Sequence, residues 1–101
     1  MAGSVYFLGS GDIAVPVVST LRETRQLELV GIGTQQDKPA GRKRRLTPTP
    51  VGRWALDQGL EVDKPKSVND EAFLDHLRGL RPDILFVASY GQLLKEAVLN
   101  L

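Results

Sequence analysis

Four short apolar segments are spaced along the chain in a way that is typical of β-strands. They lie at residues 4–8 (SVYFL), 27–33 (LELVGIG), 60–63 (LEVD) and 83–89 (DILFVAS). The last segment runs from Asp83 to Ser89 with no polar residue between its ends. Such a continuous apolar run predicts a strand that is covered on both faces and has a neighbour on each side.

Between these segments, apolar residues recur at helical spacing. The first helix is predicted to follow Asp12, whose side chain can cap it, and to end near Arg25. The second helix begins with Thr49 as its N-cap and Pro50 as its first helical residue, and Gly59 ends it.

A third helix is predicted from Asn69, with Gly79 and Pro82 closing it, and a fourth over residues 92–99. Strands that alternate with helices of roughly ten residues predict βαβ units, a parallel sheet and right-handed crossovers. The fold class is therefore α/β, with about four strands in one domain over residues 1–101.

The composition excludes several classes of protein. The chain has no cysteine, so no disulfide framework and no thiolate metal site are expected. The first residues lack the basic and apolar regions of a signal peptide, and no apolar stretch reaches the roughly 18 residues of a membrane helix. We expect a cytoplasmic protein that contacts no membrane and binds no metal.

Residues 34–50 (TQQDKPAGRKRRLTPTP) are predicted to form a flexible Gly/Pro-rich loop that concentrates positive charge. The loop holds five of the 13 Lys and Arg residues and one of the 12 acidic residues, which leaves eight basic against eleven acidic residues elsewhere. Its basic residues are Lys38, Arg42, Lys43, Arg44 and Arg45. This cluster favours contact with phosphate or nucleic acid, although a solvated charge run or a nuclear localisation tract has the same composition.

The turn after the first strand is a second candidate for ligand binding. Gly9, Ser10 and Gly11, followed by Ala14, match the G-x-G-x-x-[GA] pattern of dinucleotide-binding turns. The second strand ends in Gly33, without the acidic residue that holds a ribose. A turn that lets strand and helix pack closely is the simpler interpretation.

Three further positions complete the candidates. His76 has no second histidine and no carboxylate cluster near it in the sequence, so we expect a surface side chain. Trp54 lies on the apolar stripe of its helix and is expected in the core. The segment 90–94 (YGQLL) follows the last strand at its carboxyl end, where open α/β sheets bind ligands, but an ordinary strand-to-helix turn has the same pattern.

Three motifs occur in a specific order along the chain. The first is FLGSGDIA at residues 7–14, and the second is TQQDKPAGR at 34–42 with a basic run and a PTPV exit at 48–51. The third joins RPD at 81–83 to ASYGQLL at 88–94. Together they resemble the N-terminal part of the methionyl-tRNA formyltransferase family, over essentially the whole chain.

The resemblance implies a Rossmann-like, three-layer domain that transfers a formyl group from 10-formyltetrahydrofolate to the amino group of methionyl initiator tRNA. It implies that the inserted loop binds the tRNA acceptor arm through Lys38, Arg42, Lys43, Arg44 and Arg45. It places the turn of Gly9, Ser10 and Gly11 at the site, and in the wall of the folate pocket it places Tyr90, Gly91, Gln92, Leu93 and Leu94.

The family's catalytic Asn, His and Asp belong to segments beyond position 101, so the resemblance implies no catalytic residue in this chain. We therefore expect a truncated half of the catalytic domain that is inactive alone. Truncation would leave the strand from Asp83 to Ser89 without a neighbour on one side, and we expect self-association through it.

Two other classes of function stay open. Another folate-dependent formyltransferase or a formyltetrahydrofolate hydrolase would share the fold, but neither needs the basic loop. A stand-alone nucleotide-binding module would use the turn at residues 9–14.

Overall fold

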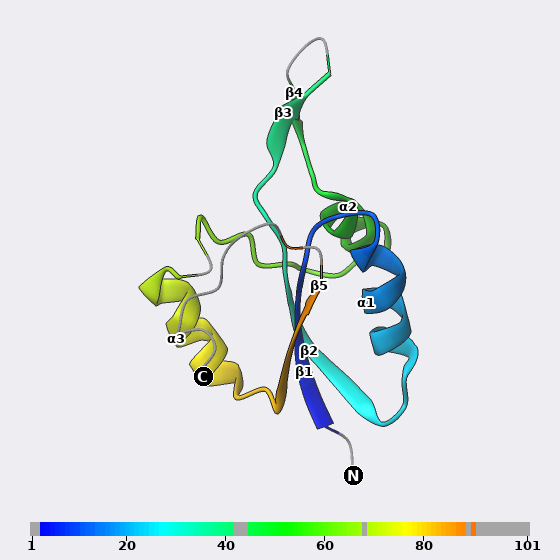
Figure 1. The fold of residues 1–101 in the computed structure, drawn as a ribbon, viewed down its shortest axis with the longest axis vertical. Helices are drawn as coiled ribbons and strands as arrows, with labels where there is room; N and C mark the ends of the chain where they lie inside the picture. The colour runs from blue at the N-terminus through cyan, green and yellow to red at the C-terminus, as the bar shows by residue number, and fades with distance from the viewer. Residues whose placement is uncertain (1–2, 42–44, 68, 89, 91–101) are drawn as a thin grey trace.

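The computed structural model describes residues 3–41, 45–67, 69–88 and 90, and it contains a parallel sheet between two layers of helices (Figure 1). The sheet has the strand order β2-β1-β5. Its strands are β1 (Gly3–Gly9), β2 (Leu27–Gly33) and β5 (Ile84–Ala88). The predicted α/β fold with a parallel sheet is confirmed, but the described residues form three parallel strands in place of about four.

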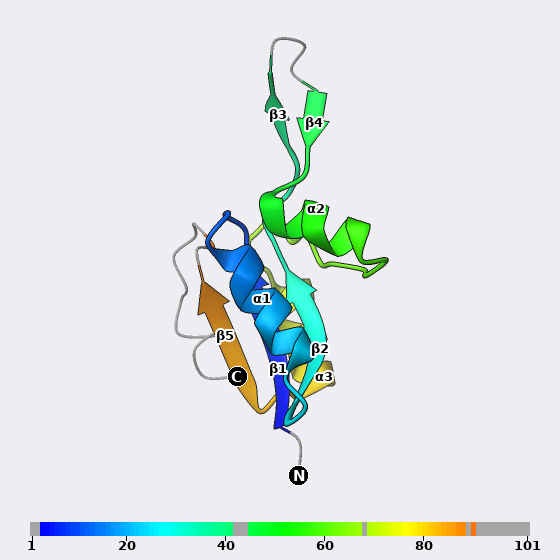
Figure 2. The same ribbon diagram turned by 90° about the vertical axis from the view of Figure 1, so that its right-hand side faces the viewer.

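Helices cover both faces of this sheet. Helices α1 (Ala14–Glu23) and α2 (Pro50–Asp57) lie on one face, and α3 (Glu71–Leu80) lies on the other (Figures 1 and 2). The arrangement is the expected three-layer one. The predicted fourth helix at residues 92–99 lies outside the described residues.

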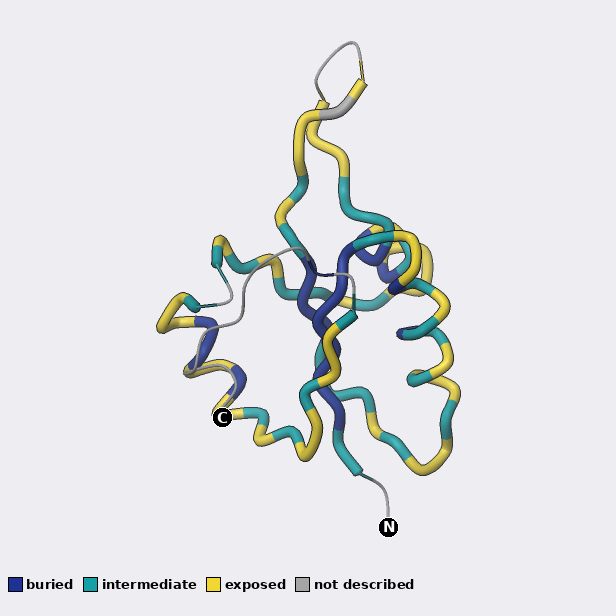
Figure 3. The backbone as a smooth tube through the Cα atoms, viewed as in Figure 1, coloured by how far each residue is buried: buried dark blue, intermediate teal, exposed yellow. Residues whose placement is uncertain are grey.

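Strand β1 is the centre of the core because it contributes side chains to both faces of the sheet. Phe7 packs with the α1 and α2 side, whereas Tyr6 and Leu8 pack with Phe73 and Leu77 on the α3 side. In Figure 3 this strand is dark blue along most of its length, and shorter buried stretches lie on the helices that cover it. A strand that is buried on both faces has a continuous apolar sequence, as the segment at residues 4–8 has.

Helix α2 begins and ends as predicted. The Thr49 hydroxyl accepts a hydrogen bond of 3.0 Å from the Gly52 amide, and Pro50 occupies the first turn. At the other end, Gly59 has φ of +70°, and the Leu60 amide donates to the Ala55 carbonyl at 2.8 Å. This backbone pattern closes a helix through a left-handed residue.

The prediction of a strand at residues 60–63 was wrong. Only one isolated parallel bridge forms there, between Asp63 and Gly33. The Leu60 amide is already bonded to the Ala55 carbonyl at the end of α2, at 2.8 Å. The bonds to β2 and to the residue after it are both made by Asp63, whose amide donates to the Ile32 carbonyl at 2.8 Å and whose carbonyl accepts from the Thr34 amide at 2.9 Å.

Two predicted helix starts were also wrong. Helix α1 has Ile13 at its N-cap and no side-chain cap, and the backbone carbonyl of Asp12, not its carboxylate, accepts from the Val15 amide at 3.3 Å. Helix α3 begins at Glu71, after Asp70 at the N-cap, so Asn69 precedes the helix. Local sequence marks such ends only to within one or two residues.

The basic loop contains a β-hairpin that its composition did not predict. Strands β3 (Lys38–Ala40) and β4 (Arg45–Thr47) pair antiparallel, with Lys38 opposite Thr47. Gly41 follows β3 with φ of +76°, a conformation that glycine adopts without strain. The hairpin projects from the body of the domain (Figures 1 and 2).

Candidate functional site

The carboxyl ends of the three parallel strands bring Ser10, Thr34 and Tyr90 to one edge of the sheet. The Ser10 hydroxyl accepts hydrogen bonds from the Thr34 hydroxyl at 3.2 Å and from the Gln35 amide at 3.0 Å. Thr34 is fully buried, and its hydroxyl also bonds that of Thr49, the N-cap of α2. The turn after β1, the end of β2 and the start of α2 are thus tied together by side chains far apart in the sequence.

The turn at Gly9, Ser10 and Gly11 is explained by packing. A Cβ atom on Gly9 would lie 2.5 Å from the Phe7 ring and 2.7 Å from the Ala88 carbonyl oxygen, so this position requires glycine. The Ser10 carbonyl accepts from the Val51 amide at 3.2 Å. Because neighbouring elements use the hydroxyl and carbonyl of Ser10, the structure favours the packing interpretation over a dinucleotide cradle.

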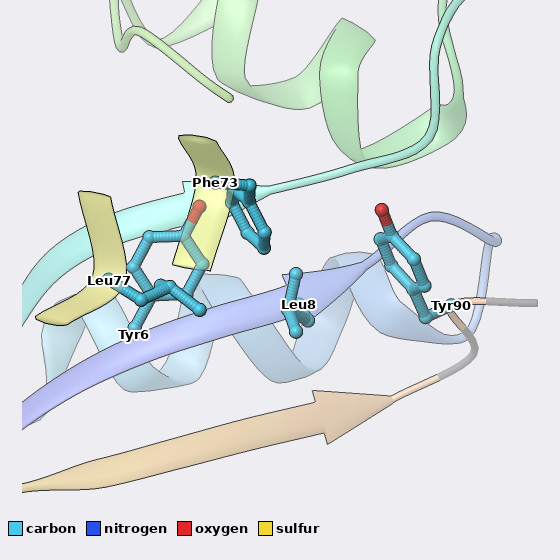
Figure 4. Packing of buried hydrophobic residues seen from close by; sticks show 5 residues of the cluster. All are labelled: Tyr6, Leu8, Phe73, Leu77 and Tyr90. Atoms are coloured by element: carbon cyan, nitrogen blue, oxygen red, sulfur yellow. The ribbon is translucent and has the colours of Figure 1, made fainter. Parts of the chain in front are cut away.

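Tyr90 is the one residue of the predicted folate segment that the structure describes. Its side chain is buried beside Leu8, and its residue is only 3% exposed (Figure 4). Its backbone carbonyl accepts a hydrogen bond from the side-chain amide of Gln35. Gly91, Gln92, Leu93 and Leu94 lie outside the described residues.

Both tyrosines have a hydroxyl held away from water, but only that of Tyr6 has a hydrogen-bond partner among the described residues. The Tyr6 hydroxyl donates a 2.6 Å hydrogen bond to Asp63, whereas the Tyr90 hydroxyl is buried without a partner among the described residues. Burial raises the pKa of Tyr90 to about 12. Burial, followed by the hydrogen bond to Asp63 and the charge of that carboxylate, raises the pKa of Tyr6 above its usual range.

These pKa shifts predict that the fold loses stability in alkali. A raised pKa means that the folded chain keeps protons that the unfolded chain releases above about pH 10, so the stabilisation is complete below that pH and declines above it. The free energy of unfolding should fall by about 1.4 kcal/mol per pH unit for each tyrosine as the pH rises from about 10 to about 12. Tyr90→Phe should halve the slope.

Denaturant unfolding at a series of pH values, with phenolate absorbance as a second readout, measures this effect. The chain has only two tyrosines, so Tyr6→Phe and Tyr90→Phe separate their signals. Titration of Tyr90 at its ordinary value of 10.0 would contradict the burial described.

The hairpin carries exposed basic residues at both of its strands. Lys38 and Arg45 are exposed, while Arg42, Lys43 and Arg44 lie outside the described residues. The only acidic residue of the loop, Asp37, forms an ion pair of 2.7 Å with Lys64, which lies outside the loop. The Asp37 carboxylate is therefore paired with Lys64 at the base of the hairpin, and not with a basic residue of the loop.

A groove that sequence reasoning did not predict lies between the hairpin and the helices. Its volume is about 790 Å³, and α1, β4 and α2 line it. Trp54, expected in the core, is half-buried: it packs against the cluster around Phe7 and also lines the groove. Helical spacing in the sequence could have indicated this wall of the groove. One face of α2 carries the four residues that line it, which are Pro50, Arg53, Trp54 and Asp57.

His76 is exposed as predicted, and the structure adds one carboxylate partner that the sequence did not indicate. Its Nε2 atom lies 3.0 Å from Oδ2 of Asp63, the oxygen that also accepts from Tyr6. The partner comes from 13 residues earlier in the chain, which sequence inspection cannot detect. Among the described residues, no group of three or more His, Asp or Glu side chains is arranged to hold a metal ion.

In the part of the chain that the structure describes, none of the helices has both the length and the apolar character that crossing a bilayer requires.

The three-layer arrangement and the polar residues at the carboxyl edge define an α/β domain of the open, parallel-sheet class. The sequence model of one family, described as formyl transferase, matches residues 4–101. The chain therefore belongs to the formyl transferase family.

Curated relatives of the chain carry the name methionyl-tRNA formyltransferase. The enzyme of Xylella fastidiosa (strain 9a5c) is 43% identical over 95 residues, which are 94% of this chain and 30% of the relative. Those of Marinobacter nauticus and Chloroflexus aggregans are 42% and 44% identical over 97 residues, 96% of this chain and 31% of each relative. The chain thus spans about a third of the length of the curated relatives it matches.

Proposed function

We propose that this chain is the N-terminal segment of a methionyl-tRNA formyltransferase and supplies its RNA-binding hairpin and one wall of the site for the formyl donor. The observation that carries the proposal is the position of the basic hairpin. Its base is bonded through Gln35 to Ser10 and Tyr90, so the exposed cations begin at the carboxyl edge of the sheet. That edge is where domains of this class bind small ligands.

The reaction joins the amine of the esterified methionine to the formyl carbon of 10-formyltetrahydrofolate. A new C–N bond forms, the bond between the formyl carbon and folate N10 breaks, and the proton of the amine replaces the formyl group on the folate. In this scheme Lys38, Arg42, Lys43, Arg44 and Arg45 hold the phosphates of the acceptor arm of the initiator tRNA.

The residues from Tyr90 to Leu94 are assigned to the folate wall. A fixed, buried tyrosine beside Leu8 supports this assignment, because its hydroxyl has no partner among the described residues and can bond a polar ring atom. The groups that perform the proton transfers are assigned to the part of the enzyme that follows residue 101. We therefore assign binding, and no catalytic step, to this segment. We place the formyl transfer of the whole enzyme in the cytoplasm.

A chimera tests the function directly. The 101-residue chain is joined to the part of the Xylella fastidiosa enzyme that follows its matched segment, and formyl transfer to methionyl-tRNA is measured. We expect the chimera to formylate methionyl-tRNA, and the 101-residue chain alone to give no product. The Xylella enzyme itself is the positive control, and its C-terminal part alone is the negative control.

The chimera also separates the competing functions. A folded chimera that passes the formyl group to a sugar nucleotide or to water, and not to methionyl-tRNA, would overturn the proposal. So would a chain whose melting temperature rises with NAD but with neither the folate nor tRNA, because that result identifies a nucleotide-binding module. The basic hairpin argues against all three alternatives, since none of them needs it.

A further inference from the structure

The groove beside the hairpin has features that phosphate binding by the cations does not explain. It is bounded by β4, the start of α1 and one face of α2, and its volume of about 790 Å³ is in the range of sites that hold a nucleotide-sized ligand. The residues that line it are Asp12, Val15, Pro16, Arg45, Leu46, Thr47, Pro48, Pro50, Arg53, Trp54 and Asp57.

The walls of the groove suit a flat ring. Trp54 is held in place by its contact with the core cluster around Phe7, and its half-exposed surface meets the groove among Pro16, Pro48 and Pro50. Leu46 on β4 is 71% exposed at the same groove. An exposed aromatic face is a stacking surface for a nucleobase, and a ring that the core already fixes loses little further freedom when a base stacks on it.

The charged groups of the groove indicate which kind of base it would bind. Arg45 and Arg53 are exposed and, within the described ranges, their side chains make no hydrogen bond or ion pair. The same holds for the carboxylates of Asp12 and Asp57. A site for phosphate alone would not place two carboxylates beside two arginines, because the carboxylates repel the anion. Carboxylates do accept hydrogen bonds from the exocyclic amino groups of cytosine, adenine and guanine.

We infer that the groove holds one unpaired nucleotide of the RNA, with an amino-bearing base against Trp54 and its phosphate on Arg53 and Arg45. This rests on the proposed function, because the hairpin must first bind the RNA beside the groove. The base carries the amino group that Asp57 or Asp12 accepts from. Uracil, which has no amino group, is held less tightly.

The chain itself provides the probe, because Trp54 is its only tryptophan. Three RNA hairpins are compared with the 101-residue chain at low salt: one with an unpaired adenosine tail, one with an abasic tail and one blunt. Affinity is followed by the anisotropy of a dye at the RNA loop, and stacking by the quenching of Trp54 emission. We expect the adenosine tail to quench Trp54 and to bind roughly 5- to 100-fold more tightly than the other two.

Variants assign the contacts. Arg53→Gln should reduce the affinity for the tailed RNA to near that of the blunt RNA, while Arg78→Gln, an exposed arginine on α3 that pairs with Asp75, should change nothing. Asp57→Asn should remove the preference for an adenosine tail over a uridine tail. These three positions are exposed, so the variants should keep the fold, and Trp54 emission without RNA checks this.

The outcomes are distinct for the groove and for the proposed function. If all three RNAs bind through the hairpin cations with equal affinity and no change in Trp54 emission, the groove inference is overturned and the proposed function stands. Equal quenching by the blunt RNA would also overturn it, because the groove would then contact duplex backbone. If no RNA binds at any salt concentration, the proposed function fails and the inference fails with it.

Discussion

Replacing Arg42, Lys43, Arg44 and Arg45 together with alanine is expected to lower the affinity for an RNA acceptor arm by roughly a hundred- to a thousandfold at low salt. The physical reason is that no other part of the chain compensates for this charge. Outside the loop, acidic residues outnumber basic ones by eleven to eight, and the loop's own Asp37 is paired with Lys64. The phosphates are therefore attracted by the hairpin and weakly repelled by the rest of the surface.

The salt dependence gives the more diagnostic number. Each phosphate contact that is lost should lower the slope of log affinity against log salt by about one unit, so the fourfold variant should lose about four units and Arg42→Ala about one. Titrations of labelled RNA at several salt concentrations measure both slopes. In the chimera with the Xylella enzyme, the same variants should raise the tRNA concentration that half-maximal formylation requires.

A matched control separates the position of the charge from its amount. Arg22, Arg25, Lys66 and Arg78 are exposed and lie outside the hairpin, and their joint replacement with alanine changes the net charge equally. We expect this control to keep the salt slope close to that of the unaltered chain. If both fourfold variants lose the same number of units, the RNA responds to net charge, and the hairpin is no binding element.

Elements that depend on local chemistry could be predicted from the sequence. Helix α2 illustrates this, because the Thr49 cap, Pro50 and Gly59 act within a few residues of the helix they bound. Strand β2 was predicted with its observed bounds, since an apolar run between turn residues is also a local signal. The position of β1 in the middle of the sheet also follows from a local signal, because the run at residues 4–8 is apolar enough for both faces of the strand to be buried.

The hairpin was not predicted because its strands have three residues each, too few for a visible alternation. A Gly/Pro-rich, basic composition is the same for a loop and for a short two-stranded ribbon. Pairing decides between them, and the composition of residues 38–47 does not show that Lys38 lies opposite Thr47.

The polar contacts of the site were invisible in the sequence for a related reason. Ser10 and Thr34 are 24 residues apart, and the carboxylate beside His76 belongs to Asp63, in the segment between α2 and α3. Trp54 was assigned to the core because periodicity tells which face of a helix is apolar. Periodicity does not show that β4 leaves a groove beside this face of α2, which exposes part of Trp54.

Strand β5 combines an apolar sequence with an open edge, which has a consequence for the behaviour of the chain. Such an apolar run is typical of a strand with neighbours on both sides, but we expected one side of it to be open, and in the described residues β5 pairs with β1 alone. Ile84, Phe86 and Val87 are 46%, 38% and 39% exposed. An apolar pocket of about 430 Å³, lined by Phe86 and residues of α1 such as Val17 and Leu21, lies beside this edge.

An unpaired, apolar edge strand is a template for a second copy of the same strand. We expect the 101-residue chain to associate as its concentration rises, and Val87→Lys to keep it monomeric, because a lysine at the edge would have to lose its hydration in the paired state. Sedimentation or light scattering over a wide concentration range measures the change. Leu46→Lys is the matched control, since Leu46 is 71% exposed but lies on the hairpin. An unaltered chain that stays monomeric throughout would contradict the prediction, and so would a control as effective as Val87→Lys, which would place the contact at the groove instead of at β5.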